Sequence, residues 1–531
     1  MGARAGQAAR RLNAARETTV AQLARHIAIV GGGTAGWLAA LILGDGARRA
    51  GGDIRLTMIE SSKIPTIGVG EGSTAVFRQM LRQFGLDEFE FLRQTDATIK
   101  YGIRHKDWRR QGVTYDGPID DPHLVCETPP GVASSWLNQY CIASGRSVAE
   151  PHLFTYLMDR GKAPYAQKLD GSFVPAGPFH HAFHFDQALV AKYLARNVPG
   201  VERIDAQVTG VSRNAETGDI ETLLLDEDRS LDADFFVDCT GFRRALIGKE
   251  MGGQWVSYVD KLPVNRAMPF WIDLAPGEQI NPFTLAWARE AGWMWSIPTR
   301  TRYGCGYVYS DRFRTPEQAQ AEIEAALGRK IEPRNDIKIN SGRLDTAWIG
   351  NCLAVGLSSS FLEPLEATSI HGTIVQLLLF AQAHLNADRA DIARHRDAYN
   401  AIVARQVDDF MRFINMHYVS ERRDTAFWQA VAGEFILPET RERLAFWSGH
   451  TPRRADFAPF PFRLPHVEEQ LFYPVLDGLG LLDRDLARAE LAAAPQLRAH
   501  ARKTAESLTR EYRQAALRTL GHREFLDGLV A

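Results

Sequence analysis

Cysteine is scarce in this chain and follows no metal-binding or redox spacing. The five cysteines among 531 residues are widely scattered, and no two of them form a C-x-x-C pair. This pattern excludes the usual zinc clamp and redox dithiol, so we expect no metal site. Isolated thiols in an odd number are typical of buried cysteines in a reducing compartment, which predicts a cytoplasmic protein.

The sequence also lacks an excess of either charge, a long apolar run and a secretory signal. Its 62 basic and 64 acidic side chains give a net charge of −2, so we expect neither nucleic acid nor a membrane surface as a partner. No apolar run reaches the roughly 18 to 20 residues of a membrane-spanning helix. Residues 1–25, rich in Ala and Arg, are interpreted as a disordered or mispredicted N-terminal tail, although an organelle transit peptide has a similar composition.

A βαβ unit follows this tail. Residues 27–30 and 54–59 are apolar strands by pattern, and the Gly-x-Gly-x-x-Gly motif of residues 31–36 joins the first strand to a helix. Such glycines permit a tight turn and a close approach of a diphosphate to backbone N–H groups. Glu60 ends the second strand, where a carboxylate binds ribose hydroxyls and disfavours a 2′-phosphate. The motif therefore predicts an FAD or NAD site and not an NADP site.

Two later apolar strands, within residues 234–241 and 352–357, are expected to join the same sheet, and their number favours the longer cofactor, FAD. We predict an α/β fold: a Rossmann-type, flavin monooxygenase-like FAD-binding domain over residues 26–375, with a substrate-side insertion at about residues 72–187. Residues 376–531 are expected to form a mainly helical C-terminal region that covers the substrate.

Helical periodicity in the C-terminal part marks residues 374–383 and 397–416. The composition of residues 487–518, rich in Ala, Arg, Glu and Leu, indicates a further helix. Between them, residues 452–465 are dense in Pro and Phe and predict a loop.

Five segments together resemble the flavin-dependent tryptophan halogenases. The resemblance extends from about residue 27 to residue 428, and its most specific element is the W-x-W-x-I-P hexapeptide. The segments are Gly31-Gly-Gly-Thr-Ala-Gly-Trp37, Ile64-Pro-Thr-Ile-Gly-Val-Gly-Glu71, Thr98-Ile-Lys100, Trp293-Met-Trp-Ser-Ile-Pro298 and Phe361-Leu-Glu-Pro-Leu-Glu366. The resemblance implies an enzyme in which FADH2, O2 and a halide yield hypohalous acid, which then halogenates an aromatic ring.

The resemblance also implies catalytic roles. Lys100 matches the essential lysine, which holds the oxidant and delivers it to the ring; burial in an apolar pocket would lower its pKa. Glu366 matches the catalytic glutamate, which polarises the oxidant and accepts the proton of the ring, while an ion pair with Lys100 is the structural alternative. Trp293, Trp295 and Pro298 match a wall between substrate and flavin, although core aromatics have the same appearance.

Position-by-position matching extends to three further groups of residues. FAD contacts are expected from Gly31, Gly32, Gly33, Thr34, Ala35, Gly36, Glu60, Ser61, Ile64, Ile67, Val69, Glu71, Val208, Leu357 and Ile370. Halide is expected at the backbone amides of Thr368 and Ser369, since turn N–H groups stabilise anions without a reactive side chain. Substrate contacts are expected from Ile103, His123, Gly70, Gly72 and Ala367.

The sequence departs from the tryptophan-specific pattern at three places. Ala367 and Ser369 replace the usual serine and glycine beside the halide, which leaves the choice of bromide or chloride open. Gly72 replaces an alanine, which suggests a more mobile lid over the flavin. Residues 451–472 contain no Tyr-Tyr pair of the kind that binds the charged ends of free tryptophan. Because a buried zwitterion without partners is unfavourable by several kcal/mol, an indole, a phenol or an indole within a larger molecule is the better candidate substrate.

These residues predict an FADH2-dependent halogenase of a small electron-rich aromatic, with bromide favoured because it is more readily oxidised than chloride. Only one dinucleotide motif is present, so reduced flavin would come from a separate NAD(P)H-dependent flavin reductase. The helical C-terminal region also suggests a homodimer. A flavin-dependent aromatic monooxygenase and a non-catalytic flavoprotein sensor are the alternatives.

Overall fold

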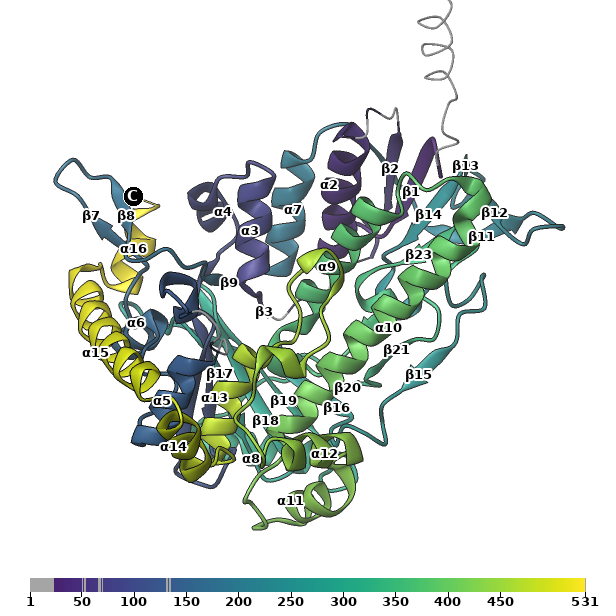
Figure 1. Ribbon diagram of the computed structural model, residues 1–531. Coiled ribbons are helices and arrows are strands. Elements are labelled where there is room, and N and C mark those ends of the chain that lie inside the picture. The colour runs from purple at the N-terminus through teal and green to yellow at the C-terminus, as the bar shows by residue number, and fades with distance from the viewer. Residues whose placement is uncertain are drawn as a thin grey trace, which may run out of the picture.

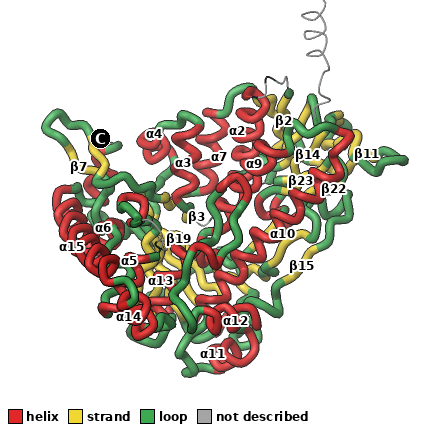
Figure 2. The backbone as a smooth tube through the Cα atoms, viewed as in Figure 1, coloured by secondary structure: helices red, strands yellow, loops and turns green. Residues whose placement is uncertain are grey.

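The computed structural model describes residues 23–49, 51, 54–64, 68, 70–129, 132 and 135–530. Two large sheets organise these residues, with helices packed on one face of the first sheet, a small antiparallel sheet on its other face, and a group of C-terminal helices beside the second large sheet (Figure 1). Figure 2 shows helices from both halves of the chain on the near side of the molecule, with strands of the sheets visible between them. This α/β arrangement with a helical C-terminal region is the predicted fold class.

The first sheet is six-stranded and mostly parallel. Its order is β10 (Val201–Asp205), β2 (Arg55–Glu60), β1 (His26–Val30), β14 (Phe235–Asp238), β23 (Cys352–Ala354) and β22 (Trp348–Ile349). The four strands predicted to share a sheet are therefore neighbours, in the order β2-β1-β14-β23. The central strand β1 is buried along its whole length, which explains why it reads as a continuous apolar run.

The last two of these strands are shorter than the sequence predicts. β14 ends at Asp238, whose carboxylate accepts hydrogen bonds from the backbone N–H groups of Leu246 and Ile247, both at 2.8 Å. β23 ends at Ala354, and a 3-10 turn, η3 (Gly356–Ser358), follows it. Both strands therefore end at the carboxyl edge of the parallel sheet, which is the edge where α/β sheets place their ligands.

Helices cover the first sheet. α2 (Thr34–Arg49) begins at the end of the glycine loop and packs between α7 (Gln187–Asn197) and α9 (Thr368–Ala383), as Figure 1 shows. Its buried residues include Trp37, Leu38 and Leu41, which enter the largest core cluster. α3 (Ala75–Gln83) packs against α9 on the same side.

The second sheet has seven strands and is mostly antiparallel. Its order is β20 (Ile337–Lys338), β16 (Arg266–Asp273), β19 (Arg302–Tyr309), β18 (Gly292–Pro298), β17 (Thr284–Ala288), β5 (Gly102–Lys106) and β6 (Thr114–Pro118). A small sheet, β3 (Glu71–Gly72), β9 (Ala182–Phe185) and β4 (Thr98–Lys100), lies where the two large sheets approach each other. The segment predicted as an insertion thus supplies strands to both the small sheet and the second sheet.

The C-terminal region is helical. Its main helices are α10 (Ile392–His417), α13 (Glu469–Leu479), α14 (Arg484–Ala492), α15 (Pro495–Arg518) and α16 (His522–Gly528). The single helix predicted over residues 487–518 is wrong, because Pro495 starts a new helix: a proline fits the first turn of a helix but not its interior. α9 is continuous across residue 375, where the predicted domain division falls. α14 and α15 pack against α5 and α6 (Figure 1).

The remaining elements complete the layers. They are α4 (Glu88–Gln94), α5 (Trp136–Ser144), α6 (Leu153–Arg160), β7 (Tyr165–Gln167), β8 (Phe173–Pro175), β11 (Val208–Arg213), β12 (Ile220–Leu225), β13 (Ser230–Asp232), β15 (Trp255–Ser257), α8 (Pro316–Leu327), β21 (Gly342–Leu344), β24 (Ser360–Phe361), α11 (Ala426–Ala430) and α12 (Pro438–Phe446).

The folded chain begins earlier than the sequence predicts. Of the predicted tail, residues 1–22 lie outside the described residues, but Leu23 and Ala24 are buried in the main core.

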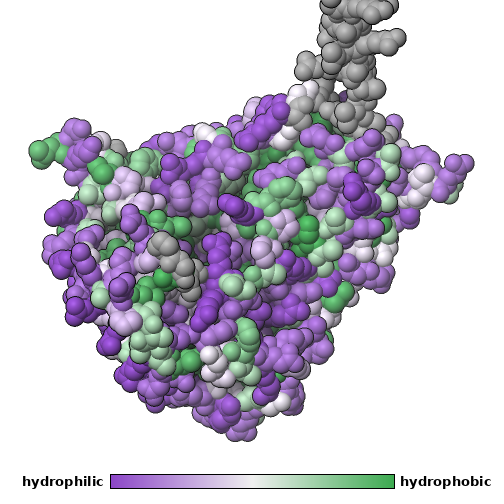
Figure 3. Space-filling model, viewed as in Figure 1, coloured by the Kyte–Doolittle hydropathy of each residue, from purple (hydrophilic) through white to green (hydrophobic). Residues whose placement is uncertain are grey.

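The face shown in Figure 3 is largely hydrophilic, with hydrophobic side chains in small interrupted areas. None of the described helices combines the length and the apolar character needed to cross a membrane.

Candidate active site

Lys100 ends β4 and is enclosed by the protein. Its side chain is 2% exposed, and its ammonium group donates a hydrogen bond to the carbonyl oxygen of Ser73 at 3.0 Å. Burial lowers the pKa of Lys100 to about 8, an effect that the negative charge of Glu366 opposes. Lys100 is therefore not an ordinary solvent-exposed lysine.

The strand that carries Lys100 is tied to its surroundings two residues earlier. The Thr98 hydroxyl donates a hydrogen bond to the carbonyl oxygen of Pro298 at 2.7 Å, at the end of β18. His184 of β9 lies beside them, with its Nε2 2.9 Å from the Thr284 hydroxyl, and burial keeps the pKa of this imidazole well below its usual value. The lysine is thus anchored to the same strand that carries the W-x-W-x-I-P motif.

Glu366 is presented by a tight turn. It ends the 3-10 turn η4 (Pro364–Glu366), and the next residue, Ala367, has left-handed backbone angles (φ 52°) before α9 begins. A non-glycine residue in this region is strained by about 1–3 kcal/mol, which is typical of functional sites. The carboxylate lies 2.7 Å from Nε2 of His417 and 3.8 Å from Nε2 of His105.

Among the described residues, Glu366 and Lys100 are not joined by an ion pair. Lys100 uses the Ser73 carbonyl oxygen, and Glu366 uses His417. The two groups nevertheless act on each other through space, since Glu366 raises the pKa of Lys100 against the effect of burial. The structural alternative of a direct ion pair is therefore not observed, and both groups keep atoms free for a reactant.

A second glutamate supports the wall of aromatic residues. Glu363 is completely buried and accepts hydrogen bonds from the Tyr418 hydroxyl at 2.9 Å and the Trp293 indole at 3.5 Å. Burial raises the pKa of this carboxyl group to about 8, so that it is mainly protonated near neutral pH. Trp293, Trp295 and Pro298 are themselves buried in β18. Their burial fits a rigid wall, and their role against the flavin remains a prediction.

The glycine loop leaves room for a diphosphate. Gly31 has a positive φ of 111°, and a Cβ there would overlap the carbonyl oxygen of Cys239, so the turn requires glycine. A Cβ at Gly33 would meet nothing within 4 Å, which shows open space above the loop. The first amides of α2 at Thr34 and Ala35 follow directly. An open cradle at a helix N-terminus fits the diphosphate of FAD.

Glu60 lies beside this cradle, as expected for a ribose-binding carboxylate. It contacts Gly32 so closely that a Cβ at that glycine would overlap it. Arg203 of β10 donates a hydrogen bond to Glu60 from Nε at 2.9 Å and lies over the ring of Trp37. The sequence pattern did not indicate this arginine, because β10 follows in the chain only after the long inserted segment.

Glu71 provides a further test of the cofactor site. Within the described part of the chain, its Oε2 is buried and has no hydrogen-bond partner. Burial raises the pKa of this carboxyl group to about 7. An enclosed carboxyl oxygen without a partner needs a hydrogen-bonding group from elsewhere. The hydroxyl and N–H groups of FAD fit this requirement.

The other predicted flavin residues are distributed around the same edge of the sheet. Gly356, next to Leu357 in η3, approaches Ala35 so closely that an added Cβ would be 2.7 Å from the Ala35 side chain. Ser61 and Ile64 follow β2, Val208 begins β11, and Ile370 is buried in the first turn of α9. Ile67 and Val69 lie outside the described residues.

The predicted halide residues form the N-terminus of α9. Thr368 and Ser369 are the first two residues of this 16-residue helix, directly after Ala367. The first amides of a helix have no partner within the helix, and the helix dipole adds a partial positive charge there. This end of α9 can therefore bind an anion next to Glu366.

The predicted substrate residues are only partly brought together. Ile103 is buried in β5, and Gly70 and Gly72 flank Glu71 in front of Lys100. His123 lies in a different element, the 3-10 turn η1 (Pro122–Val125), with Nδ1 3.1 Å from Asp121 and its ring against Trp136.

The phenylalanines of residues 457–472 mostly serve ordinary packing. Phe472 packs against Phe413 and Trp447, and Phe460 stacks on His466. Phe462 is 57% exposed. Phe460 and Phe472 therefore pack within the protein and do not line an open site.

The suggestion that Gly72 loosens a lid is not supported by its surroundings. Gly72 lies in β3, where it pairs with His184 of β9. A Cβ at Gly72 would lie 3.0 Å from Nζ of Lys100 and 3.5 Å from the Thr284 hydroxyl. The absence of a side chain at Gly72 therefore allows Nζ of Lys100 to lie close to β3.

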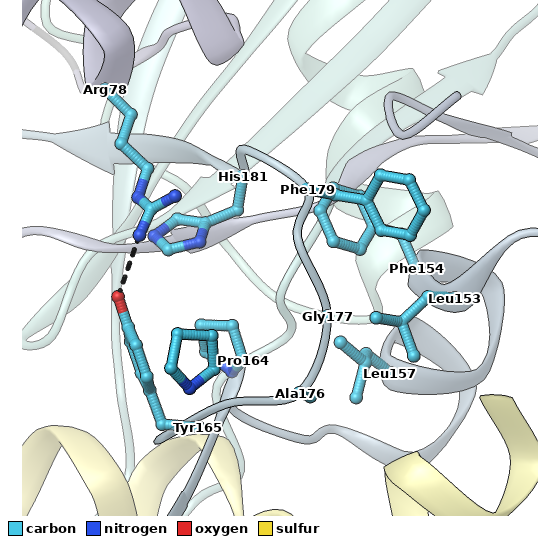
Figure 4. A pocket seen from close by; sticks show the side chains of 11 residues that line it. Arg78, Leu153, Phe154, Leu157, Pro164, Tyr165, Ala176, Gly177, Phe179 and His181 are labelled. Carbon is cyan, nitrogen blue, oxygen red and sulfur yellow. Dashed lines mark hydrogen bonds between the residues drawn. The ribbon is translucent and has the colours of Figure 1, made fainter. Parts of the chain in front are cut away.

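A pocket near α3 is separate from this site (Figure 4). Arg78 donates a hydrogen bond to the Tyr165 hydroxyl at 3.1 Å beside His181. The pocket has a volume of about 10 Å³, which is roughly the space of one water molecule. It is too small to be a substrate site.

Sequence reasoning missed the histidines around Glu366. His105 lies five residues after Lys100 in β5, on the same face as Ile103, and His417 ends the long amphipathic helix α10. Both are buried, at 1% and 0% exposure. A histidine at the end of an otherwise apolar helix face was the available signal, but only the fold shows that it contacts Glu366.

Comparison with known proteins gives a consistent result. The family model described as tryptophan halogenase matches residues 26–494. The 7-chloro-L-tryptophan 6-halogenase KtzR of Kutzneria sp. (strain 744) is 33% identical over 518 residues, covering 90% of this chain and 97% of the relative. The solved structure of BrvH, a flavin-dependent halogenase from Brevundimonas sp. BAL3, aligns with a TM-score of 0.81 at 30% identity, over 96% of this chain and 99% of that chain.

A tryptophan halogenase from Shewanella frigidimarina NCIMB 400 aligns with a TM-score of 0.85 at 27% identity, over 95% of this chain and 97% of that chain. These matches confirm the resemblance that the sequence motifs indicated, together with the enzyme class. Since the family model and the relatives span nearly the whole length, and the family's motifs meet around one enclosed lysine, the chain belongs to the tryptophan halogenase family of flavin-dependent halogenases.

Proposed function

We propose that this halogenase acts on an electron-rich aromatic ring that lacks the charged ends of free tryptophan, such as an indole. The observation that carries the proposed halogenation chemistry is the buried ammonium group of Lys100. Burial lowers the pKa of this group to about 8, and the negative charge of Glu366 opposes that effect. An amine that exchanges its proton near neutral pH can both hydrogen-bond an oxidant and react with it.

The glycine loop, Glu60 and Glu71 would hold FAD, which in its reduced form supplies, with O2, the oxidising equivalents that turn halide into hypohalous acid. Thr368 and Ser369 would hold the halide at the N-terminus of α9. Bromide is the preferred halide in this proposal, because it is more easily oxidised than chloride.

Lys100 would receive the hypohalous acid through its ammonium protons, or as a haloamine, and present the halogen to the ring. The Ser73 carbonyl oxygen orients Nζ, and Gly72 leaves it space. Glu366 would accept the proton that the ring loses, and its partner His417 fixes the carboxylate in position. The buried Trp293, Trp295 and Pro298 would keep the substrate away from the flavin.

The substrate part of the proposal depends on what the C-terminal region lacks. Residues 451–472 contain no Tyr-Tyr pair, and their phenylalanines are largely used in packing. A zwitterion placed there would lose hydration without charged partners, at several kcal/mol. An uncharged indole, a phenol or an indole within a larger molecule would not.

A direct assay tests the proposal. The enzyme would be supplied with FADH2 by a separate NAD(P)H-dependent flavin reductase in air, with bromide or chloride, and with indole or L-tryptophan as competing substrates. We expect halogenated indole by mass spectrometry and a kcat/KM for tryptophan lower by roughly 10-fold or more. A preference for free tryptophan would refute the substrate assignment, and hydroxylation without halogenation would favour the monooxygenase alternative.

The sensor alternative makes a different prediction for Lys100→Met. A halogenase loses turnover in this variant while it keeps FAD, whereas a sensor keeps both its flavin and its aromatic ligand with no turnover to lose. Size-exclusion chromatography of the full chain, with and without the reductase, tests the proposed homodimer and shows whether the reductase acts without a stable complex.

A further inference from the structure

Three side chains from distant parts of the chain converge behind the proposed oxidant site. His105 comes from β5, Glu366 from the turn before α9, and His417 from the last turn of α10. One nitrogen of each imidazole and one carboxylate oxygen all lie within 4.8 Å of one another. Both imidazoles are buried, and the glutamate side chain is 15% exposed.

The contact between His417 and Glu366 is defined by the other ring nitrogen of His417. Nδ1 of His417 lies 3.0 Å from the backbone carbonyl oxygen of Phe413, which can only accept, so Nδ1 carries a proton. A neutral imidazole then directs the lone pair of Nε2 at Glu366 Oε1, 2.7 Å away. Two lone pairs at this distance repel each other unless a proton lies between them, and a metal ion bound to both atoms would hold them farther apart, at about 3.4 Å.

The same hydrogen bond is the arrangement that proteins use to orient a metal-binding histidine. In metal sites, the ring nitrogen that faces away from the ion usually donates to a backbone carbonyl or a carboxylate. In His417 the acceptor is the Phe413 carbonyl oxygen, and this contact favours the tautomer that carries its proton on Nδ1 and can bind a metal through Nε2.

His105 supplies the second observation. Within the described part of the chain, neither of its ring nitrogens has a hydrogen-bond partner, although both are buried. The ring stacks on Tyr115 with centroids 4.6 Å apart and planes at 10°. A buried imidazole without any partner is unfavourable, and a ligand between Nε2 and Glu366 would satisfy it.

We infer that His105, Glu366 and His417 form a binding site for one divalent transition-metal ion, with Zn²⁺ as the best match. Two imidazoles and one carboxylate are a common zinc ligand set, which leaves a fourth position for water. Two atoms bound to one zinc ion at about 2.1 Å lie about 3.4 Å apart in tetrahedral geometry. The His417 and Glu366 atoms must therefore move apart from 2.7 Å, while the more distant His105 must move closer. His105 can make this adjustment because no hydrogen bond restrains its ring.

Occupation of this site would inhibit the enzyme. A carboxylate bound to zinc cannot accept the proton of the ring, so a bound ion withdraws Glu366 from its proposed role. This inhibitory consequence rests on the proposed function, whereas metal binding itself does not.

The charges around the cluster make a distinctive prediction. Lys100 acts electrostatically on Glu366, and its positive charge would repel a dication. The other groups that face the cluster, Trp108 and Tyr115, carry no charge near neutral pH. We therefore expect Lys100→Met to tighten zinc binding several-fold, an effect that loss of folding cannot imitate.

The experiment measures metal binding by the full-length protein without flavin. Zn²⁺ would be titrated calorimetrically and its stoichiometry measured by plasma mass spectrometry, and Co²⁺ would serve as a visible-absorption probe. The variants are Glu366→Gln, His417→Gln, His105→Phe and Lys100→Met. The matched control is His26→Gln, since both ring nitrogens of His26 already have partners, Thr57 and Arg55 of β2.

We expect one Zn²⁺ per chain, intense Co²⁺ absorption bands in the visible range, and affinity reduced by roughly 100-fold or more in the Glu366 and His417 variants. His26→Gln should bind like the wild type. Absence of stoichiometric metal in the wild type would overturn the inference and leave a shared proton as the link between His417 and Glu366. Unchanged affinity in Glu366→Gln and His417→Gln would overturn it as well.

The two proposals fail in different ways. If metal binds but the metal-free enzyme halogenates none of the arenes, the proposed function is at fault. If the enzyme halogenates but Zn²⁺ neither binds nor inhibits, the metal site is at fault. EDTA-reversible loss of halogenation, proportional to the occupied fraction, would support both.

Discussion

Replacing Lys100 by methionine should make the protein more stable and catalytically inactive. Methionine has a similar length and removes the charge that burial disfavours. Lowering the lysine pKa from 10.5 to about 8, at about 1.4 kcal/mol for each pH unit, corresponds to an upper limit of about 3 kcal/mol against the folded state. The variant also leaves the Ser73 carbonyl oxygen without its donor, which costs about 1–3 kcal/mol. We therefore expect a small net gain, between roughly 0 and 2 kcal/mol.

The pH dependence of this gain identifies its cause. Below pH 8 the lysine is charged in both the folded and the unfolded chain, and the folded chain bears the full penalty. Between pH 8 and 10.5 the folded chain has lost the proton and the unfolded chain still holds it, so wild-type stability rises with pH. The advantage of Lys100→Met should thus be greatest below pH 8, and toward pH 10.5 it should turn into a loss of about 1–3 kcal/mol, because only the missing hydrogen bond to Ser73 then remains.

Urea unfolding of both proteins across this pH range measures the difference, and a halogenation assay with flavin titration measures the function. Turnover should fall by about 100-fold or more while FAD binding is kept. Lys192→Met, at an exposed position of α7, is the control and should show neither effect. A stability difference that stays constant from pH 7 to pH 10.5 would refute the argument that a buried charge is responsible.

Three further predictions follow from other parts of the site. The free energy of unfolding of Glu363→Gln should rise relative to that of the wild type as pH increases from 4.5 to 8. The folded wild type keeps this carboxyl group protonated up to about pH 8, whereas the unfolded chain loses the proton near pH 4.5. A difference in urea unfolding that does not change with pH would contradict this. Gly33→Ala should weaken FAD binding by roughly 10-fold or more, because the added Cβ would occupy the open space of the cradle. The Tm of the flavin-free protein should not change, since the Cβ meets no protein atom within 4 Å, and a lowered Tm would show that this space is not free. Gly72→Ala should reduce halogenation by roughly 10-fold or more with FAD binding unchanged, since its Cβ lies 3.0 Å from Nζ of Lys100; full activity would mean that the lysine position is not critical.

The parts of the fold that repeat a simple pattern could be predicted from the sequence. The glycine loop, the strand before it and Glu60 are close together in the chain and have strong local preferences, so the βαβ unit was predicted nearly to the residue. The later strands were found because strands buried on both faces read as apolar runs. Their ends were not, because side-chain contacts such as those of Asp238 decide where they turn.

The candidate site could be predicted only where a motif names its residues. Lys100 and Glu366 were found through their motifs, and no local pattern joins either to His417 or His105. These contacts arise from long-range packing of α10 on the second sheet, which a single sequence does not encode as a period. The reason for glycine at position 72 was likewise invisible, because it depends on a side chain from another strand.

The hydrogen bond from Thr98 to Pro298 has a consequence for enzyme engineering. Under the proposed function, it joins Lys100 and the aromatic wall into one rigid unit, so a change that thins the wall would also shift the point at which halogen is delivered. Attempts to admit larger arenes by trimming β18 should therefore lose regioselectivity together with rate.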